Sequence, residues 1–341
     1  MLGGFFALLA AVTFALNNAS MRRGVLSGSI AQAMAITVPL GVPLFFIPTA
    51  LAGYLGKLFD FSPQAVLALS AAGIIHFVGG RYCNFRATKA MGANLVGPIQ
   101  QVSLILTLVL AIGILGESLT PLRMFGIALV VLGPMLTVRG DAEKRTRPPR
   151  ATDKAESPVE KLESGRPPPF EINYAEGVIF SLLSAVAYGS SPILIRFGLE
   201  TKDIGTSLAG GLISYLAATA VFLPALLWPG RLRHVLSQEV EAAKWFTLSG
   251  VMVCVSQMFT YISLALAPVS VVTPIQRVSI VFRIYFGRLL NPQHEVFGGK
   301  LYLGTAISLI GALALSLSTD FVLAYVALPD WAQTIARWQW P

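Results

Sequence analysis

The sequence predicts an all-α integral membrane protein made of two similar halves. Hydrophobic residues make up 55% of the 341 positions and charged residues only 12%, and the mean hydropathy is +0.69. These values exceed those of water-soluble domains of this length. The motif VGPIQQVS at residues 96–103 returns as VTPIQRVS at residues 272–279, and such an internal repeat indicates that the two halves share one fold.

Each half contains five apolar runs, so we expect about ten transmembrane helices. Runs of about 20 apolar residues are long enough to cross a bilayer, and they differ from the alternating pattern of a membrane β-barrel. The first run has no Lys or Arg before it, which favours a spanning helix over a cleaved signal peptide. The expected helices cover residues 3–20, 29–54, 64–86, 92–115, 120–138, 176–198, 206–228, 244–266, 269–289 and 300–318.

Four segments follow from this division. We expect the first five-helix repeat at residues 1–138 and the second at residues 174–318. Residues 139–173 are polar, charged with both signs and rich in proline, which predicts a flexible linker, with a docking or regulatory segment as the alternative. Residues 319–341 contain three of the five tryptophans; we expect them to lie along the membrane interface, and a disordered tail is the alternative.

Lys and Arg are distributed unevenly between the two sides of the expected helices. Apart from Arg81, Arg277 and Arg283, which lie within spans, 17 of these residues fall on the side that carries the linker and 5 on the other. The positive-inside rule therefore predicts a cytoplasmic linker and external termini, in a multi-pass protein of the plasma or inner membrane.

The composition also argues against several functions. None of the 17 carboxylates lies near the centre of an expected span, so a buried proton relay or a divalent-cation cage lacks its ligands. Cys83 and Cys254 fall inside separate apolar helices and indicate neither a disulfide framework nor a metal site. The net charge is +8, and the basic residues sit at helix ends and in the linker, which fits membrane orientation better than nucleic-acid binding. We expect no cofactor and no metal.

Polar residues follow the repeated proline in both halves. Pro98 and Pro274 each remove a backbone donor within an apolar run, which frees a carbonyl toward a cavity or, alternatively, serves helix packing only. Gln100 and Gln276 follow, each with a serine three residues later, so that the two polar groups share a helix face. Interrupted helices at equivalent positions predict a binding site near the membrane midplane, between the repeats.

Arginines in the second copy add to this prediction. Arg277 replaces the neutral Gln101 of the first copy and lies about 12 Å inside its expected span at 1.5 Å per residue. A guanidinium at that depth is costly unless it faces water, a partner or an anionic ligand. Arg283 lies seven residues after Gln276 and shares its face. In the alternative, Arg277 bonds carbonyls inside the bundle and Arg283 extends toward the membrane surface.

The third helix of the first half offers further candidates. His76 is the only histidine within an expected span, which makes it a candidate proton carrier, with a packing role as the alternative. Arg81 lies close enough to the helix end to reach the membrane surface instead of a ligand. In the first helix of each half, Asn17 occupies the place of Ser191 and adds a polar break toward the expected cavity.

A resemblance to a known family rests on the motif at residues 96–103, on the Gly116–Glu117 pair with the later Gly126 and Gly133, and on the matching residues of the second half. Over residues 5–318 the chain resembles the EamA branch of the drug/metabolite transporter superfamily. The resemblance implies two inverted five-helix repeats around a central cavity that opens to each side in turn. Ten-helix members usually have cytoplasmic termini, whereas the charge distribution of this chain predicts external termini. The resemblance implies nine substrate-binding residues, which are Asn17, His76, Tyr82, Gln100, Ser190, Gln257, Tyr261, Gln276 and Arg277. Arg81 is the tenth candidate.

We therefore expect a secondary transporter of a small anionic or zwitterionic metabolite, and not an enzyme. A flippase for a lipid-linked or amphipathic phosphate is the first alternative. An integral-membrane enzyme acting on lipids is the second, and it lacks an intramembrane Asp or Glu as acid or base. The expected partners are a small-molecule substrate and the lipid bilayer, with a homodimer as an alternative to the monomer and no nucleic acid.

Overall fold

The computed structural model describes residues 2–106, 109–110, 120–146, 172–199, 203–226, 228–267, 275–316 and 329–338, and the single positions 201, 272 and 323. Within this part the secondary structure is entirely helical. The helices are α1 (Leu2–Ser27), α2 (Ile30–Thr37), α3 (Gly41–Leu51), η1 (Leu55–Phe59), α4 (Pro63–Gly73), η2 (Ile74–Gly80), α5 (Arg81–Met91), α6 (Ala93–Gln100), α8 (Pro121–Thr146), α10 (Tyr174–Gly198), α11 (Ile204–Leu226), α12 (Arg231–Leu236), α13 (Val240–Leu266), α15 (Ser279–Leu290), α16 (Gly299–Ser316) and α18 (Asp330–Ala336).

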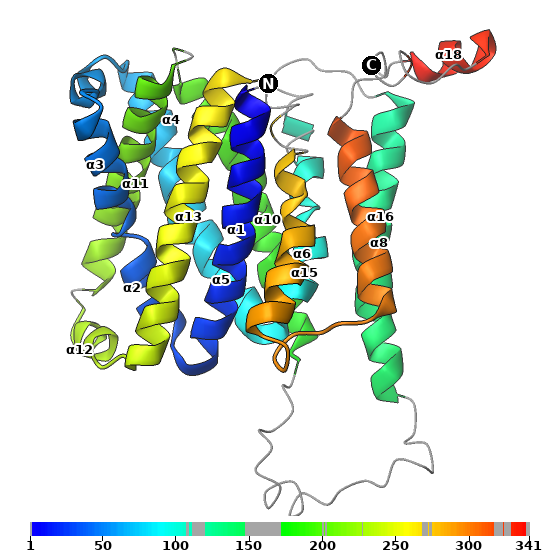
Figure 1. Cartoon of the computed structure of the whole chain (residues 1–341), viewed down its shortest axis with the longest axis horizontal. Coiled ribbons are helices and arrows are strands. Elements are labelled where there is room, and N and C mark those ends of the chain that lie inside the picture. Colours follow the sequence, from blue (N-terminus) through cyan, green and yellow to red (C-terminus); the bar gives the residue numbers. More distant parts are fainter. Residues whose placement is uncertain are drawn as a thin grey trace, which may run out of the picture.

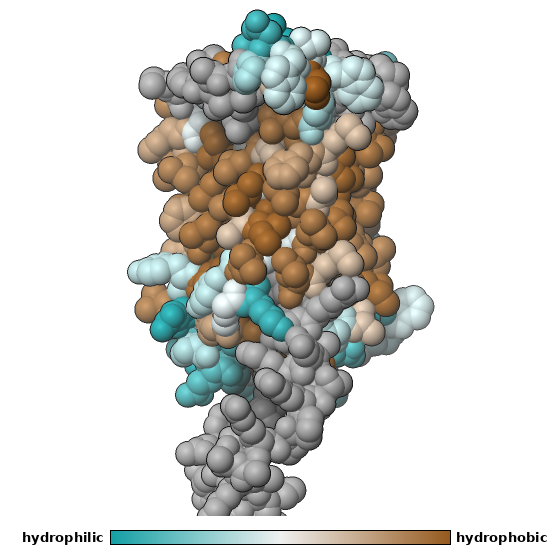
Figure 2. All heavy atoms as spheres, turned by 90° about the vertical axis from the view of Figure 1, so that its right-hand side faces the viewer, coloured by the Kyte–Doolittle hydropathy of each residue, from teal (hydrophilic) through white to brown (hydrophobic). Residues whose placement is uncertain are grey.

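The long helices run side by side in one bundle (Figure 1). Helix α1 begins at the same end of the bundle as α18, which we call the terminal end. Helix α8 ends and α10 begins at the opposite end, which we call the linker end. The face that carries α8 and α16 shows a broad hydrophobic band between hydrophilic rims (Figure 2), as expected for a surface that contacts lipid.

Six helical segments are long and apolar enough to cross a membrane. The described residues do not establish the expected total of ten, because helices such as α6 and α15 are shorter and parts of the expected spans 92–115 and 269–289 lie outside the described residues. The six segments are Leu2–Ser27, Ile30–Leu51, Pro63–Met91, Tyr174–Gly198, Ile204–Leu226 and Val240–Leu266.

Equivalent helices of the two halves run in opposite directions. Helix α1 starts at the terminal end, whereas α10 starts at the linker end, where the Asn173 amide donates to the carbonyl of Ala90 at the end of α5. The first helix of each half packs against the third helix of the other half, α1 against α13 and α10 against α4, η2 and α5. The bundle is therefore held together by exchanged contacts between the halves.

The third helices of the two halves differ by one residue. In the first half, Gly73 and Thr88 are 15 positions apart, whereas Gly250 and Leu264 are 14 apart in the second. The π-helix η2 lies in the longer segment, and a π turn accommodates an extra residue within a helix. Both glycines allow close helix contact, because a Cβ at Gly73 would overlap the Ser214 carbonyl and one at Gly250 would lie 2.9 Å from Leu40. The extra residue thus shifts the residues after Gly73 by one position relative to their counterparts after Gly250.

Helices α8 and α16 form a pair of their own. A Cβ on Gly133 would lie 2.6 Å from the Gly304 carbonyl oxygen, and one on Gly311 would lie 2.8 Å from the Gly126 carbonyl oxygen. The glycines that recur in the sequence therefore form the packing seam of this pair.

The linker and the tail fall mostly outside the described residues. Helix α8 continues to Thr146 and so occupies the first eight positions of the segment 139–173, which contain good helix formers such as Ala, Glu, Lys and Arg. In the tail, the short helix α18 carries Trp331 and Ile335, both more than half exposed. An interfacial position for the tail remains a prediction.

A buried ion pair closes the linker end. Both carboxylate oxygens of Glu295 accept backbone N–H groups at the start of α6, from Ala93 at 2.7 Å and Asn94 at 2.9 Å. The Arg22 Nε lies 3.8 Å from Glu295 Oε1, and both side chains are at most 1% exposed. Arg22 also donates to the carbonyls of Thr88 and His294. Burial raises the pKa of Glu295, while Arg22 and the two amides act in the opposite direction. The cluster ties α1, the α5–α6 turn and the α15–α16 loop together.

At the terminal end, Asp203 caps α11. Its carboxylate accepts the Thr206 amide at 2.9 Å and the hydroxyls of Thr201 and Thr206 at 2.7 Å. Burial would raise the pKa of Asp203, but these hydrogen bonds and the nearby Lys57 lower it to about 2. The Asp203 carboxylate is therefore ionised at neutral pH, and its negative charge interacts favourably with the positive end of the α11 dipole.

Replacing Glu295 should destabilise the protein. Glu295→Gln removes the charge that faces Arg22 and one acceptor of the α6 cap, and leaving a buried charge unpaired costs about 3 kcal/mol. Glu176→Gln is the matched control, because its ion pair with Arg86 is 33–40% exposed and exposed pairs contribute little to stability. Unfolding in mixed micelles measures both changes, and equal losses would contradict the role given to Glu295.

Gly73 should tolerate no side chain. Gly73→Ala places a methyl group against the backbone of Ser214, and such overpacking costs about 1–3 kcal/mol. Gly79→Ala, six residues later, meets no atom within 4 Å and should leave the thermal unfolding midpoint unchanged or slightly higher. A similar midpoint for both variants would show that α4 and α11 pack less closely than described.

Candidate functional site

Three adjoining cavities lie at the centre of the bundle, between the two halves. The outer cavity has an empty volume of about 660 Å³, part of which is open to the outside. It lies toward the terminal end and is lined by Ala10, Ala11, Phe14, His76, Tyr188, Ser191, Pro192, Ile195, Ser256, Gln257, Thr260, Gln276, Arg277 and Ser279. Phe14, Tyr188, Arg277 and Ser279 also line the inner cavity of about 340 Å³, which reaches Gln100 and Arg283. The third cavity, of about 270 Å³, reaches Asn17 and Arg81.

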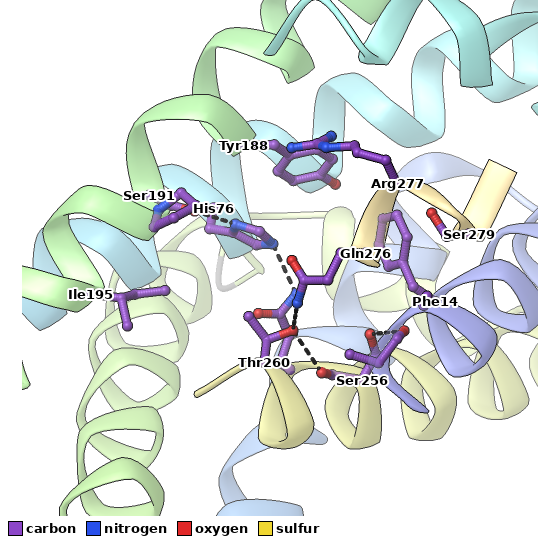
Figure 3. Close-up of a pocket in the computed structure, with 14 residues that line it drawn as sticks. Phe14, His76, Tyr188, Ser191, Ile195, Ser256, Thr260, Gln276, Arg277 and Ser279 are labelled. Atoms are coloured by element: carbon purple, nitrogen blue, oxygen red, sulfur yellow. Dashed lines mark hydrogen bonds between the residues drawn. The ribbon is translucent and has the colours of Figure 1, made fainter. Parts of the chain in front are cut away.

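His76 is held between the two halves. Its Nδ1 lies 2.7 Å from the Ser191 hydroxyl oxygen and its Nε2 lies 3.1 Å from the Gln257 amide nitrogen. The imidazole also packs against the Tyr188 ring, with centroids 4.5 Å apart, as Figure 3 shows. A neutral imidazole satisfies both neighbours, since one ring nitrogen donates and the other accepts. His76 is therefore fixed in the wall of the outer cavity.

The repeated glutamines make the same contact in both halves. Gln276 Nε2 donates to the Thr260 hydroxyl at 2.8 Å, and Gln100 Nε2 donates to Asn84 Oδ1 at 2.8 Å. Both pairs are 16 residues apart in the sequence and connect the third helix of a half to the segment that follows the repeated proline. Gln276 faces the outer cavity and Gln100 the inner one. The repeat thus places one amide group on each side of the centre.

Arg277 lies where the outer and inner cavities meet. It lies in the short helical stretch at residues 275–277, just before α15, and its guanidinium extends toward the ring of Tyr188 (Figure 3). Its Nε is buried and has no hydrogen-bond partner within the described part of the chain. The same holds for Oε1 of Gln257, which lines the outer cavity too. The site therefore offers a charged donor and a neutral acceptor to a ligand.

A second arginine, Arg283 of α15, lines the inner cavity. Arg283 is 3% exposed, and it donates to Gln100 Oε1 from both terminal nitrogens, at 3.2 and 3.3 Å, and to the Ala93 carbonyl at 3.3 Å. Its guanidinium carbon lies 5.9 Å from the centre of the Phe14 ring. Arg283 points into the bundle, which differs from the extension toward the membrane surface that the sequence left open.

Arg81 also points inward. It donates to the Thr37 carbonyl at 2.7 Å and to the Tyr215 hydroxyl at 3.3 Å, and its guanidinium lies 5.3 Å from the centre of the Phe77 ring. Asn17 accepts the Ser249 hydroxyl at 2.7 Å. Both line the third cavity, but their polar contacts within the protein make them part of its wall.

Seven of the ten sequence-predicted site residues line one of the three cavities, and three lie elsewhere. Tyr82 is 39% exposed on the outer surface and accepts a hydrogen bond from Arg86. Ser190 donates to carbonyls of its own helix, whereas the adjacent Ser191 faces the cavity. Tyr261 is fully buried against α11, where it donates to the Ser214 hydroxyl at 2.8 Å. The seven are Asn17, His76, Arg81, Gln100, Gln257, Gln276 and Arg277.

The predicted set lacks several residues that line the outer cavity. Ser191 occupies the place of Asn17, and Thr260 that of Asn84, so the repeat contained a signal for both. Phe14 and Tyr188 supply aromatic walls to all three cavities, and nothing in the sequence distinguishes them from packing residues. The described wall offers hydroxyl, amide, imidazole and guanidinium groups, and the described residues contain no cluster of three His, Cys, Asp or Glu side chains.

The comparisons agree with this architecture. A sequence model of the EamA-like transporter family matches residues 1–139 and 175–317. No curated protein matches the chain. A solved structure, titled only as the crystal structure of a protein, is 18% identical and superposes with a TM-score of 0.56 over 92% of this chain and 94% of that chain, which shows the fold alone. Because the family match covers both halves, this chain belongs to the EamA-like transporter family, as a multi-pass membrane protein of the drug/metabolite transporter type with an internal repeat.

Proposed function

We propose that this protein is a secondary transporter that carries a small anionic or zwitterionic metabolite across the membrane by alternating access. The proposal depends on one observation, which is the position of Arg277 between two central cavities with its Nε unpartnered in the described part of the chain. A guanidinium in an apolar bundle is costly without a counter-charge. A carboxylate or phosphate on a ligand supplies that charge and two acceptors for the planar fork.

The described lining of the three cavities supports an anionic ligand group. It includes three arginines and no Asp or Glu among the described residues. Arg81 already has a carbonyl and a hydroxyl as acceptors, so Arg277 is the arginine best placed to meet a ligand. The aromatic rings of Phe14 and Tyr188 and the free oxygen of Gln257 provide contacts for the remainder of a small molecule.

The arrangement also supports alternating access. The outer cavity lies toward the terminal end, whereas the linker end is joined by the contacts of Arg22, Glu295 and Arg283 with the α5–α6 region. The first helix of each half packs against the third helix of the other half. A second conformation, with the cavity open at the linker end, can therefore use the same types of helix contact with the roles of the two halves reversed. Rocking of one repeat against the other about a central site is the usual motion of transporters built in this way.

We further propose that the linker end faces the cytoplasm of a plasma or inner membrane. Among the described residues, that end carries Arg23, Arg86, Lys89, Arg231, Arg233, Lys244, Arg288 and Lys300. Clustering of Lys and Arg near the ends of spans is typical of the cytoplasmic side.

Removal of the Arg277 charge should weaken anion binding. Arg277→Gln introduces the residue that the first half has at this place, and the loss of a charge-assisted contact should weaken binding of a carboxylate probe such as benzoate by about tenfold or more. Arg288→Gln is the control, because it removes an exposed charge from α15, the helix that follows Arg277. Ligand-induced thermal stabilisation measures binding, and counterflow in proteoliposomes measures transport. Equal responses of the wild type and Arg277→Gln would refute the proposal.

The orientation can be tested independently of transport. In a Cys83→Ser, Cys254→Ala background, a cysteine introduced at Arg233 in α12 should react with a membrane-impermeant maleimide only after the membrane is opened. A cysteine at Asp60, in the turn after η1 at the terminal end, should react in intact cells. The opposite pattern would place the linker outside.

A further inference from the structure

We infer that the site is built for a ligand group with two negative charges, held by Arg277 and Arg283 together across the inner cavity. The inference rests on the proposed function and names its substrate class as a dianion, either a phosphate monoester or a dicarboxylate.

The two arginines meet at one cavity. Both line the inner cavity, whose other described lining residues are neutral. In each, the Nε is buried and has no hydrogen-bond partner within the described residues. A single monoanion would balance only one of the two guanidiniums. In a low-dielectric bundle the second charge would still be uncompensated, whereas a dianion balances both.

The hydrogen-bond acceptors of Arg283 among the described residues are neutral. Gln100 Oε1 accepts from its two terminal nitrogens at 3.2 and 3.3 Å, which is longer than the 2.7–2.9 Å typical of charge-assisted bonds. Gln100 is itself oriented by Asn84 at 2.8 Å and Ser184 at 3.0 Å, so its oxygen faces Arg283. These contacts hold the guanidinium in place and leave its charge available to a ligand.

The nearby carboxylate is already engaged. Glu295 accepts the amides of Ala93 and Asn94 and pairs with Arg22. Arg283 has no salt bridge among the described residues, and its acceptors there are the Ala93 carbonyl and Gln100. Within the described part of the site, neither Arg277 nor Arg283 forms a salt bridge, and Glu295 attracts Arg283 only from beyond salt-bridge distance.

The dimensions of the two cavities suit such a ligand. The inner cavity, whose volume of about 340 Å³ includes space open to the outside, adjoins the outer cavity at Phe14, Tyr188 and Arg277, which line both. The body of the ligand would occupy the outer cavity, against the two aromatic rings. The charged end then lies between α15 of the second half and α6 of the first, where it contacts both repeats.

Binding of matched monoanions and dianions tests the inference. Phenyl phosphate is a dianion at pH of about 8, because its second pKa is near 6, and methyl phenyl phosphate keeps the ring and the phosphorus with one charge. Phthalate and its monomethyl ester form the carboxylate pair. Ligand-induced thermal stabilisation of the full chain in nanodiscs gives the apparent Kd. In the wild type, at least one dianion should bind about tenfold tighter than its monoanion, and the better pair identifies the group.

Three variants separate the contributions. Arg283→Gln should abolish the preference for the dianion but still bind the monoanion, which also shows that the site is folded. Gln100→Glu places a negative charge against Arg283 and should abolish the same preference, even if Arg283→Gln does not fold. Arg288→Gln should behave as the wild type.

The outcomes distinguish this inference from the function on which it rests. If neither dianion is preferred in the wild type, or if the preference persists in Arg283→Gln or Gln100→Glu, the two-arginine site is overturned and Arg283 only joins α15 to α6. If Arg277→Gln then still loses monoanion binding, the proposed transporter of anions stands. If no anion binds, or if Arg277→Gln binds as the wild type does, the proposed function itself fails.

Discussion

The burial of guanidinium groups in an apolar bundle is the constraint on which the rest of this structure depends. Each buried arginine needs acceptors, because lipid and aliphatic side chains supply none. Arg22 contacts Glu295 and two backbone carbonyls, and Arg81 contacts a carbonyl and the Tyr215 hydroxyl. Arg283 has two neutral acceptors. The series runs from an ion pair at the linker end to arginines that have only neutral hydrogen-bond acceptors at the central cavities, which is where we propose that an anionic ligand binds.

The internal repeat extends to single hydrogen bonds. Arg22 Nη1 donates to the Thr88 carbonyl at 3.0 Å, and Arg196, its counterpart 174 positions later, donates from Nη1 to the Leu264 carbonyl at 3.2 Å. Both carbonyls lie in the last turn of the third helix of a half, where a positive charge interacts favourably with the negative end of the helix dipole. The repeat therefore places equivalent arginine contacts at opposite ends of the bundle. A structure with equivalent contacts at its two ends is suited to two conformations that open in opposite directions.

Sequence patterns predicted the parts of this fold that follow from periodicity, and they did not resolve contacts over long separations. The apolar runs located six membrane-crossing segments, and the repeated motif located Gln100, Gln276 and Arg277 at the cavities. The resemblance implies Ser190, whereas Ser191 faces the cavity. A uniformly apolar helix does not reveal in its sequence which face points inward, and a shift of one residue turns a side chain by about 100°. The pairing of Arg22 with Glu295 depends on tertiary packing, so only the structure reveals it.

The symmetry is broken where the chemistry is concentrated. Gln101 and Arg277 are equivalent in sequence, as are Arg81 and Gln257, so each half has a charge where the other has an amide. Arg277 and Arg283 both belong to the second half, and Arg283 reaches Gln100 and Ala93 of the first half. Motion of one repeat against the other must therefore change the surroundings of these guanidiniums. The proposed anion, by entering between the halves, would alter the contact that joins them and so couple occupancy of the site to the relative position of the repeats.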